Sequence, residues 1–257
     1  MTAQSKKVQL ELCVYSIESA LEAEAGGADR VELCDNPPQG GTTPSYGMIL
    51  AARRALKAKL HVIVRPRGGD FLYSAAEFDV MKNDIDVCKD LGVHGVVIGI
   101  LLPDGTVDKA RTRELVERAK PMSVTFHRAF DMTADPQQAL EDVIETGCSR
   151  VLTSGQAPTA MEGRELIAKL VQQAGKRTIV MPGVAIRDHN IAELMRTTGA
   201  TEFHTAASKT LASGMRYRNP NLSMGDGSFA EEYRITIADR EMVRRMREAA
   251  DAATQNP

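Results

Sequence analysis

Two features of the sequence predict an α/β fold, a single (β/α)8 TIM-like barrel followed by a C-terminal loop and helix. Eight short apolar runs alternate with segments of helical periodicity, as in a parallel sheet whose strands are each followed by a helix. A helix end, a glycine, a small residue and a strand also recur in that order, in GGADRVEL, LGVHGVVI, TGCSRVLT and TGATEFHT. Four copies of a double βα unit give eight strands, as in this barrel. A doubly wound open sheet fits less well, because no glycine-rich dinucleotide fingerprint follows the first strand.

The predicted strands are rich in Val, Ile and Leu without strict alternation, which is typical of strands that are covered on both faces. They span residues 8–14, 30–34, 60–66, 95–100, 123–129, 150–154, 177–183 and 202–206. The barrel is therefore expected over about 8–208, and an extension over about 209–257 completes one domain of residues 1–257. Within the extension, residues 209–236 are expected to form an irregular loop, and a final helix begins near Asp239.

Capping signals place several helices between these strands. Ser74 and Glu77 have the spacing of a capping box. Thr43 and Asp135 each precede a proline, which suits a capping residue before the first helical position. Asp188 is expected to cap the next-to-last helix. Glycines are expected to end four of the helices, at Gly26, Gly92, Gly147 and Gly199.

Composition excludes several classes of partner. The formal net charge is −2 and the pI is about 6.2, which gives no electrostatic basis for binding nucleic acid or an anionic membrane. No apolar run is long enough for a membrane helix, and the first residues do not form a secretory signal. Four cysteines are too few for a disulfide framework, so they indicate reduced thiols in a cytoplasmic protein. No organic cofactor is indicated.

The tripeptide Glu-Leu-Cys occurs twice, at residues 11–13 and 32–34, near the ends of the first two predicted strands. Neighbouring parallel strands lie about 4.8 Å apart, and the active face of such a barrel is at the carboxyl ends of its strands. Two thiolates from Cys13 and Cys34 suit a soft ion such as Cu(I), whereas zinc would need two further ligands. Core packing is the alternative for both, since cysteine is among the most buried residue types, and it is the expected role of Cys88 and Cys148.

Charged residues from several strands are expected at the same face. Lone carboxylates of Glu11 and Glu32 inside a barrel would be costly, so we expect Arg65 and His127 to be their partners. Two interpretations remain open. The four residues form a structural ion network, or they form a catalytic set in which the carboxylates and the histidine move protons and the arginine holds an anion.

A second set of residues is expected to contact a substrate. Arg67, Arg128, Asp131 and His204 follow or belong to strands three, five and eight. Gly183 and Ala206 lie at the ends of strands seven and eight, where many barrels bind phosphate through backbone N–H groups. Small residues in these positions also serve plain packing.

The motifs together resemble one known family. VRPRGGDFLYS, VTFHRAFDM, RVLTSG, VMPG, GATEFH and SGMRYRN, with both Glu-Leu-Cys copies and QGGTTPS, are similar to the CutC family from about residue 8 to residue 250. The resemblance implies a TIM-like barrel that is cytoplasmic and often homo-oligomeric. It also implies a role in copper homeostasis, with Cu(I) bound by Cys13 and Cys34. The turn after strand seven reads Pro182-Gly183-Val184-Ala185, where members often carry a further glycine.

Three functional hypotheses follow. The first is a cytoplasmic copper homeostasis protein that binds Cu(I) through Cys13 and Cys34. The second is a barrel enzyme, a lyase, isomerase or hydrolase, whose small anionic substrate is held by Arg65 and Arg67. In that case the cysteines are packing residues or adventitious copper ligands. The third is an interaction scaffold based on residues 209–236, a segment for which self-association is the stronger expectation.

Overall fold

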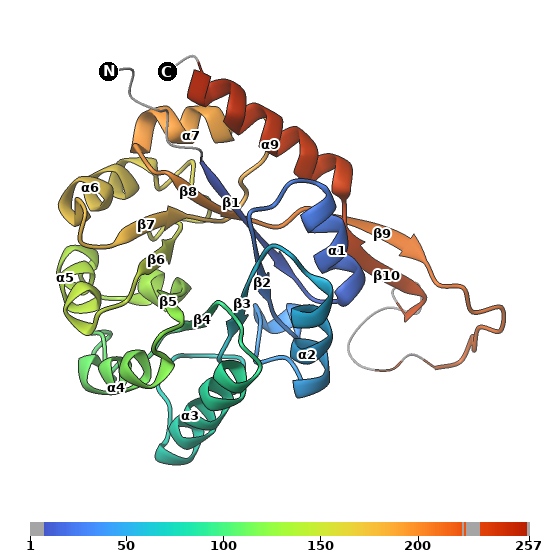
Figure 1. The fold of residues 1–257 in the computed structure, drawn as a ribbon, viewed down its shortest axis with the longest axis horizontal. Helices are drawn as coiled ribbons and strands as arrows, with labels where there is room; N and C mark the ends of the chain where they lie inside the picture. Colours follow the sequence, from blue (N-terminus) through green and yellow to red (C-terminus); the bar gives the residue numbers. More distant parts are fainter. Residues whose placement is uncertain (1–7, 223, 225–231, 256–257) are drawn as a thin grey trace.

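Eight parallel strands form a nearly closed barrel at the centre of the fold (Figure 1). The computed structural model describes residues 8–222, 224 and 232–255. Hydrogen-bonded neighbours follow the order β7-β6-β5-β4-β3-β2-β1-β8. The predicted barrel is therefore confirmed. The strands are β1 (Gln9–Val14), β2 (Arg30–Leu33), β3 (Lys59–Ile63), β4 (Gly95–Ile98), β5 (Ser123–Phe126), β6 (Arg150–Thr153), β7 (Ile179–Pro182) and β8 (Glu202–Thr205).

Eight α-helices surround the strands among the described residues (Figure 1). They are α1 (Ile17–Ala25), α2 (Tyr46–Ala55), α3 (Ala75–Asp90), α4 (Lys109–Ala119), α5 (Pro136–Thr146), α6 (Arg164–Ala174), α7 (Ile191–Thr198) and α9 (Arg240–Gln255). Successive side chains of a strand point to opposite sides, so each strand faces two different environments. In β1, Leu10 and Leu12 belong to the main apolar core, whereas Glu11 between them meets charged partners from neighbouring strands.

Two of the predicted caps are confirmed and two are wrong. Ser74 forms the capping box of α3 with Glu77, and the Asp135 side chain accepts from two N–H groups at the start of α5. The cap of α2 is Ser45 rather than Thr43, because the Thr43 hydroxyl instead accepts the backbone N–H of Arg65 at 3.0 Å. Asn190 precedes α7, and Asp188 pairs with Arg245 of α9 at 2.9 Å.

The segment predicted to be an irregular loop contains a two-stranded antiparallel sheet. Strands β9 (Ser208–Ala212) and β10 (Arg234–Ala238) pair in register, and Figure 1 shows them projecting from the barrel beside α1. The backbone N–H of Ala238 donates to the Ser19 hydroxyl of α1 at 3.1 Å. Residues 223 and 225–231, which the predicted loop also included, lie outside the described residues. The strands were missed because more than twenty residues separate them, whereas the sequence signal of a hairpin requires two runs joined by about two to five residues.

The final helix begins next to Asp239, as predicted, and it packs against the start of the chain, where Arg247 donates to the carbonyl of Val8 at 2.8 Å. Val243 and Met246 of α9 are fully buried. A Cβ at Gly26, which follows α1, would lie 2.6 Å from the Val243 Cβ, so this close approach needs a glycine. Within the described part of the chain, no helix has both the length and the apolar character to cross a membrane.

Candidate functional site

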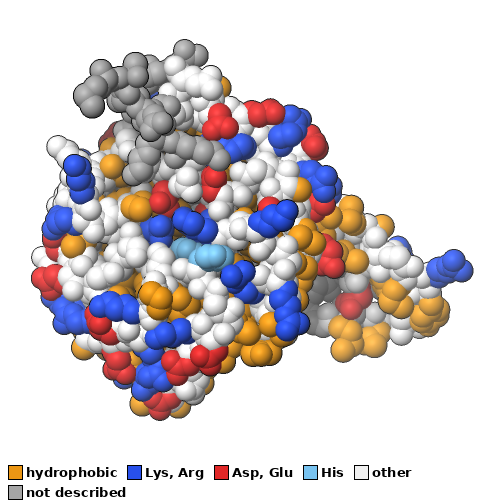
Figure 2. Space-filling model, in the orientation of Figure 1, with side chains coloured by type: hydrophobic (Ala, Val, Ile, Leu, Met, Phe, Trp, Pro, Cys, Tyr) orange, Lys and Arg blue, Asp and Glu red, His pale blue; other side chains and the backbone are white. Residues whose placement is uncertain are grey.

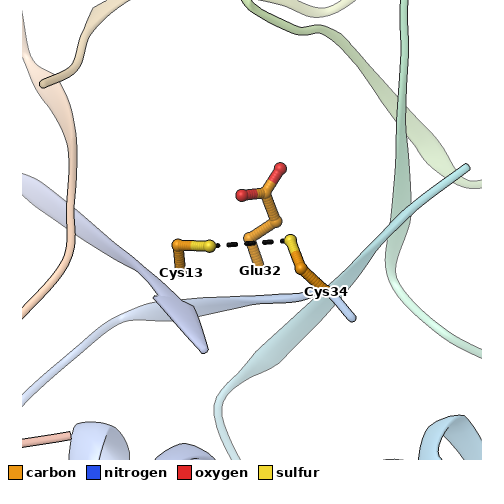
Figure 3. A group of neighbouring side chains, drawn as sticks. All are labelled: Cys13, Glu32 and Cys34. Atoms are coloured by element: carbon orange, nitrogen blue, oxygen red, sulfur yellow. Dashed lines mark hydrogen bonds between the residues drawn. The ribbon is translucent and has the colours of Figure 1, made fainter. Parts of the chain in front are cut away.

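The two Glu-Leu-Cys segments bring their sulfur atoms together (Figure 3). Cys13 lies in β1, and Cys34 follows the last residue of β2, where its backbone N–H donates to the carbonyl of Val14 at 2.9 Å. The Sγ atoms of Cys13 and Cys34 are 3.5 Å apart. In Figure 3 the two sulfurs face each other, and the carboxylate of Glu32 extends on one side of them. Ligand atoms of these three residues all lie within 4.8 Å of one another.

The environment makes the two thiols unequal. A hydrogen bond with Cys34 lowers the pKa of the Cys13 thiol despite its burial. Burial, and then the interaction with Cys13, raises the pKa of Cys34 well above its usual range. Burial also raises the pKa of the Glu32 carboxyl to about 8. Cys13 is therefore the first of the two thiols to ionise, and Glu32 is largely protonated at neutral pH.

This donor set fits a soft monovalent ion better than zinc. Both cysteines are free thiols, so both sulfurs can serve as ligands. One carboxylate is the third potential donor, and the cluster found among the described residues has no fourth member. Structural zinc sites require four ligands, whereas Cu(I) favours sulfur donors. The same two sulfurs are also close enough to pack as reduced thiols without any ion.

A layer of buried charges lies beside the cysteines. Register places Arg30 and His204 next to Glu11 on the two neighbouring strands, and the Glu11 carboxylate accepts hydrogen bonds from both. The distance from His204 Nδ1 to the Glu11 carboxylate is 2.8 Å. Arg30 also reaches Glu202 at 2.7 Å, and Arg150 meets the same Glu202 carboxylate at 2.6 Å. We name Glu11, Arg30, Arg150, Glu202 and His204 the ionic layer.

The ionic layer fixes the charge of its members. Burial alone would raise the pKa of Glu11, but Arg30 and His204 hold it far below its usual range. Burial opposes the charged form of His204, yet the bond to Glu11 and the nearby Glu32 raise its pKa. The Nε2 atom of His204 lies 3.7 Å from the Glu32 carboxylate. His204 therefore connects the ionic layer to the cysteine cluster.

The expected pairing of Glu11 and Glu32 with Arg65 and His127 is wrong. Arg65 donates to three backbone carbonyls, of Gln39 at 2.6 Å, Gly41 at 2.8 Å and Gly69 at 2.7 Å. His127 Nδ1 accepts the backbone N–H of Ala129 at 3.1 Å. Strands β3 and β5 end before both residues, so their side chains serve the loops that follow rather than the barrel interior.

His127 is a buried neutral imidazole. Burial, and then the nearby Arg65, lowers its pKa to about 3. Because Nδ1 accepts a hydrogen bond, the proton of the neutral ring is on Nε2, which has no partner among the described residues. A Cβ at Gly99 would lie 2.3 Å from the ring, so only glycine at that position leaves room for this histidine.

Acid is expected to destabilise the protein through His127. The folded-state pKa of about 3 lies below the ordinary 6.5, so the unfolded chain binds a proton between these values and the folded chain does not. The stability is fully present above pH 6.5 and falls by about 1.4 kcal/mol per pH unit through this group as the pH drops towards 3.

The variant His127→Asn keeps an acceptor for the Ala129 N–H and should flatten this slope by that amount between pH 6 and pH 4, as measured by denaturant unfolding. His189→Asn is the control, because its side chain is 75% exposed. Equal slopes for the native chain and His127→Asn would show that His127 does not titrate as described.

A pocket of about 420 Å³ opens at the carboxyl ends of the strands. Seven of the predicted site residues line it, namely Cys13, Glu32, Arg65, His127, Arg128, His204 and Ala206. Five others lie elsewhere. Cys34 packs beside Cys13, and Glu11 lies behind His204 in the ionic layer. Arg67 pairs with Glu77 and Asp70. Asp131 pairs with Arg128 and accepts the backbone N–H of Ser154 after β6. The backbone N–H of Gly183 donates to the Thr153 carbonyl.

Sequence reasoning missed several members of the site. Arg30 lies two residues before Glu32 in β2, and Glu202 lies two residues before His204 in β8. Residues two positions apart in a strand share a face, so this spacing could have predicted the ionic layer. Tyr15 and Arg187 line the pocket from loops, where no periodic pattern marks them. Burial, and then the charge of Cys13, raises the pKa of Tyr15 well above its usual range, so its hydroxyl stays protonated.

Known proteins share both the sequence and the fold. A CutC family protein of Chromobacterium violaceum is 55% identical over 244 residues, which cover 95% of this chain and 98% of that protein. The human protein named copper homeostasis protein cutC homolog is 47% identical over 235 residues, 91% of this chain and 86% of the relative. The crystal structure of a CutC protein from Streptococcus agalactiae superimposes with a TM-score of 0.74 at 30% identity, covering 77% of this chain and 98% of the other. The CutC family model matches residues 8–209, and the chain belongs to the CutC family.

Proposed function

We propose that this chain is a cytoplasmic copper homeostasis protein that binds Cu(I) through Cys13 and Cys34. The observation that carries the proposal is the 3.5 Å separation of the two sulfur atoms at the barrel mouth. The pKa of Cys13 is lowered, which favours the thiolate form that binds metals. Cys13 is half-buried and lines the pocket, so an ion can reach it from solvent. The human relative is named for copper homeostasis, which supports the same assignment here.

Copper K-edge X-ray absorption of the Cu(I)-loaded chain tests this assignment. We expect one copper per chain, an edge typical of Cu(I), and two sulfur scatterers in the first coordination shell. A double variant, Cys88→Ala with Cys148→Ala, should give the same spectrum, because burial raises the pKa of both thiols to about 12. A first shell without sulfur would contradict the proposal.

We also propose that the chain forms a homo-oligomer through the hairpin of β9 and β10. Leu211 and Ile235 face each other across the two strands and are 43% and 51% exposed. Met215 and Tyr217, in the loop between the strands, are 59% and 72% exposed. Figure 2 shows apolar side chains gathered on this projecting part of the molecule. Contiguous exposed apolar groups on a projecting element are typical of an interface.

Replacing both facing residues, in Leu211→Ser with Ile235→Ser, is expected to convert an oligomer to monomers at micromolar concentration. The reason is the loss of the apolar contact that would be buried between copies. Sedimentation velocity measures the change. Val80→Ser is the control, because Val80 is similarly exposed at 46% but lies on α3. A native chain that sediments as a monomer would refute the proposal.

A second candidate function is an enzyme that acts at the same barrel mouth. The observation that favours it is His127, a neutral imidazole that lines the pocket and whose Nε2–H has no partner in the described part of the chain. Such a group can donate a hydrogen bond to a substrate oxygen, while Glu32 and His204, 3.7 Å apart, can move a proton. Chemistry of this kind would suit a lyase, an isomerase or a hydrolase.

Solvent-deuterium exchange tests this candidate. Copper-free protein in D₂O is expected to catalyse exchange of a C–H proton next to the carbonyl of at least one member of a panel of small anionic keto compounds, as measured by proton NMR. His127→Asn, which keeps an acceptor for the Ala129 N–H, should slow that exchange, and circular dichroism should show that the variant is folded. Exchange at the same rate with both proteins would contradict a catalytic role for His127.

A further inference from the structure

The pocket at the barrel mouth carries more positive than negative charge. Three guanidinium groups line it, from Arg65, Arg128 and Arg187, and the one acidic side chain in the lining is Glu32, which is largely protonated at neutral pH. Arg128 is balanced by Asp131 at 2.8 Å. Neither Arg65 nor Arg187 has a carboxylate within ion-pair distance in the part of the chain that the structure describes. The pocket therefore holds two positive charges that the surrounding protein does not neutralise.

Arg65 is the more deeply buried of the two. It is 6% exposed, and its three hydrogen bonds are to neutral backbone carbonyls. Its Nε has no partner among the described residues, and its guanidinium lies 5.0 Å from the centre of the Phe71 ring. A buried charge without a counter-ion is costly. An anion in the pocket would offset that cost.

Arg187 is held at the pocket with most of its donors free. One guanidinium N–H donates to the carbonyl of Ile186 at 2.7 Å, and the backbone N–H donates to Asn190 at 2.8 Å. A guanidinium has five N–H donors. The other four on Arg187 have no acceptor among the residues described, so they are available to a ligand with several oxygens.

The turn that precedes Arg187 has an unusual backbone. Val184 and Ala185 have φ values of 80° and 56°, in a region that side-chain-bearing residues rarely adopt, least of all a β-branched one. Both residues line the pocket, and their backbone N–H groups donate to no described acceptor. Ala206, after β8, lines the same wall. The ends of strands seven and eight are where barrels often bind phosphate.

We propose that the barrel mouth binds a small organic phosphate monoester, with its phosphate on Arg187 and the Gly183–Ile186 turn and its organic part towards Phe71 and Cys13. A phosphate monoester carries a charge of about −1.5 to −2 at pH 7, which matches two uncompensated guanidinium groups better than a single carboxylate does. The pocket volume of about 420 Å³ lies within the range of small-molecule sites. The inference rests on the second candidate function in treating the pocket as a substrate site, and it does not depend on copper.

Calorimetric titration with glycerol 3-phosphate, inorganic phosphate, succinate and glycerol tests the proposal. We expect glycerol 3-phosphate to bind most tightly, inorganic phosphate more weakly, and glycerol not at all. Arg187→Gln should weaken glycerol 3-phosphate binding by about tenfold or more, through loss of charge-assisted hydrogen bonds. Arg196→Gln is the matched control, because Arg196 is exposed near the end of α7 that is remote from the pocket. The amide signals of Val184 and Ala185 in a ¹⁵N–¹H spectrum should shift on binding.

Three other outcomes of the titrations would overturn the proposal. If Arg187→Gln and Arg196→Gln weakened glycerol 3-phosphate binding equally, the effect would come from the overall charge of the protein and not from a contact with Arg187. If inorganic phosphate bound as tightly as the monoester, the site would not recognise the organic part of the ligand. If succinate bound more tightly than glycerol 3-phosphate, the preferred ligand would be a dicarboxylate and not a phosphate. The titrations are run on copper-free protein, in which glycerol 3-phosphate should still bind, because none of the groups proposed to hold the phosphate depends on copper. Phosphate binding without any catalysed deuterium exchange would refute the enzyme while supporting the anion site, and the reverse result would refute only the anion site.

Discussion

Replacing both Cys13 and Cys34 with serine is expected to weaken Cu(I) binding by about 10²–10⁴-fold or more. The removal of a single outer partner of a metal site typically costs about 10–100-fold, and the loss of a ligand costs at least as much for each thiolate. The remaining donor of the cluster is the Glu32 carboxylate, a hard ligand that Cu(I) does not favour. An anaerobic competition titration against a tight Cu(I) chelator measures the change.

The controls separate ligand loss from damage to the fold. Cys88→Ala with Cys148→Ala removes two buried thiols elsewhere in the chain and should leave the affinity unchanged. Circular dichroism should show the same helix content in every variant. If the serine variant competes for Cu(I) as well as the native chain does, the repeated Glu-Leu-Cys is two similar strands rather than a metal site.

Replacing Glu11 with glutamine is expected to lower the free energy of unfolding by about 3–5 kcal/mol. Breaking a buried ion pair by removing one partner has this cost, because it leaves a buried charge uncompensated. Glu11 is 1% exposed and accepts hydrogen bonds from both Arg30 and His204. Arg30 would keep Glu202, but His204 would lose the carboxylate that favours its charged form. Denaturant unfolding at pH 7 measures the loss.

The matched control is an ion pair on the surface. Glu141 and Arg177 lie 2.6 Å apart with both side chains solvent-accessible. Exposed pairs contribute little because water screens them. Glu141→Gln should therefore leave the unfolding midpoint almost unchanged. If Glu11→Gln has no larger effect than Glu141→Gln, the ionic layer does not stabilise the barrel.

The strand pattern predicted the fold well, but not the C-terminal hairpin. The eight apolar runs and the recurring glycines give the barrel because each βα unit carries its own local signals. The pairing of β9 with β10 depends on contacts with α1 and on residues far apart in the chain. Local signals do not specify such contacts, so the strands were not predicted from sequence.

The sequence predicted that several residues of the candidate site lie near one another, but not which groups they contact. Strand ends identified Cys13 and Cys34 because adjacent parallel strands must bring their ends together. The strand ends did not identify the partner of Glu11. Several arginine and histidine side chains lie on nearby strands, and the stagger of the barrel decides which of them reaches Glu11. Val184 and Ala185 adopt a backbone that usually indicates glycine, so their conformation could not be read from residue type.

The hydrogen bond between Glu11 and His204 joins residues that are 193 positions apart. At a synthesis rate of about 5–20 residues per second, roughly 10–40 s pass between the synthesis of β1 and that of β8. During that time β1 lacks one of its two neighbours, and α1 lacks the helix that packs over Gly26. Nascent chains stalled before residue 202 should be digested by protease within their first strands. The incomplete barrel of the nascent chain therefore exposes strand and helix surfaces that the finished protein buries. We expect the nascent chain to depend on chaperones until the last helix leaves the ribosome.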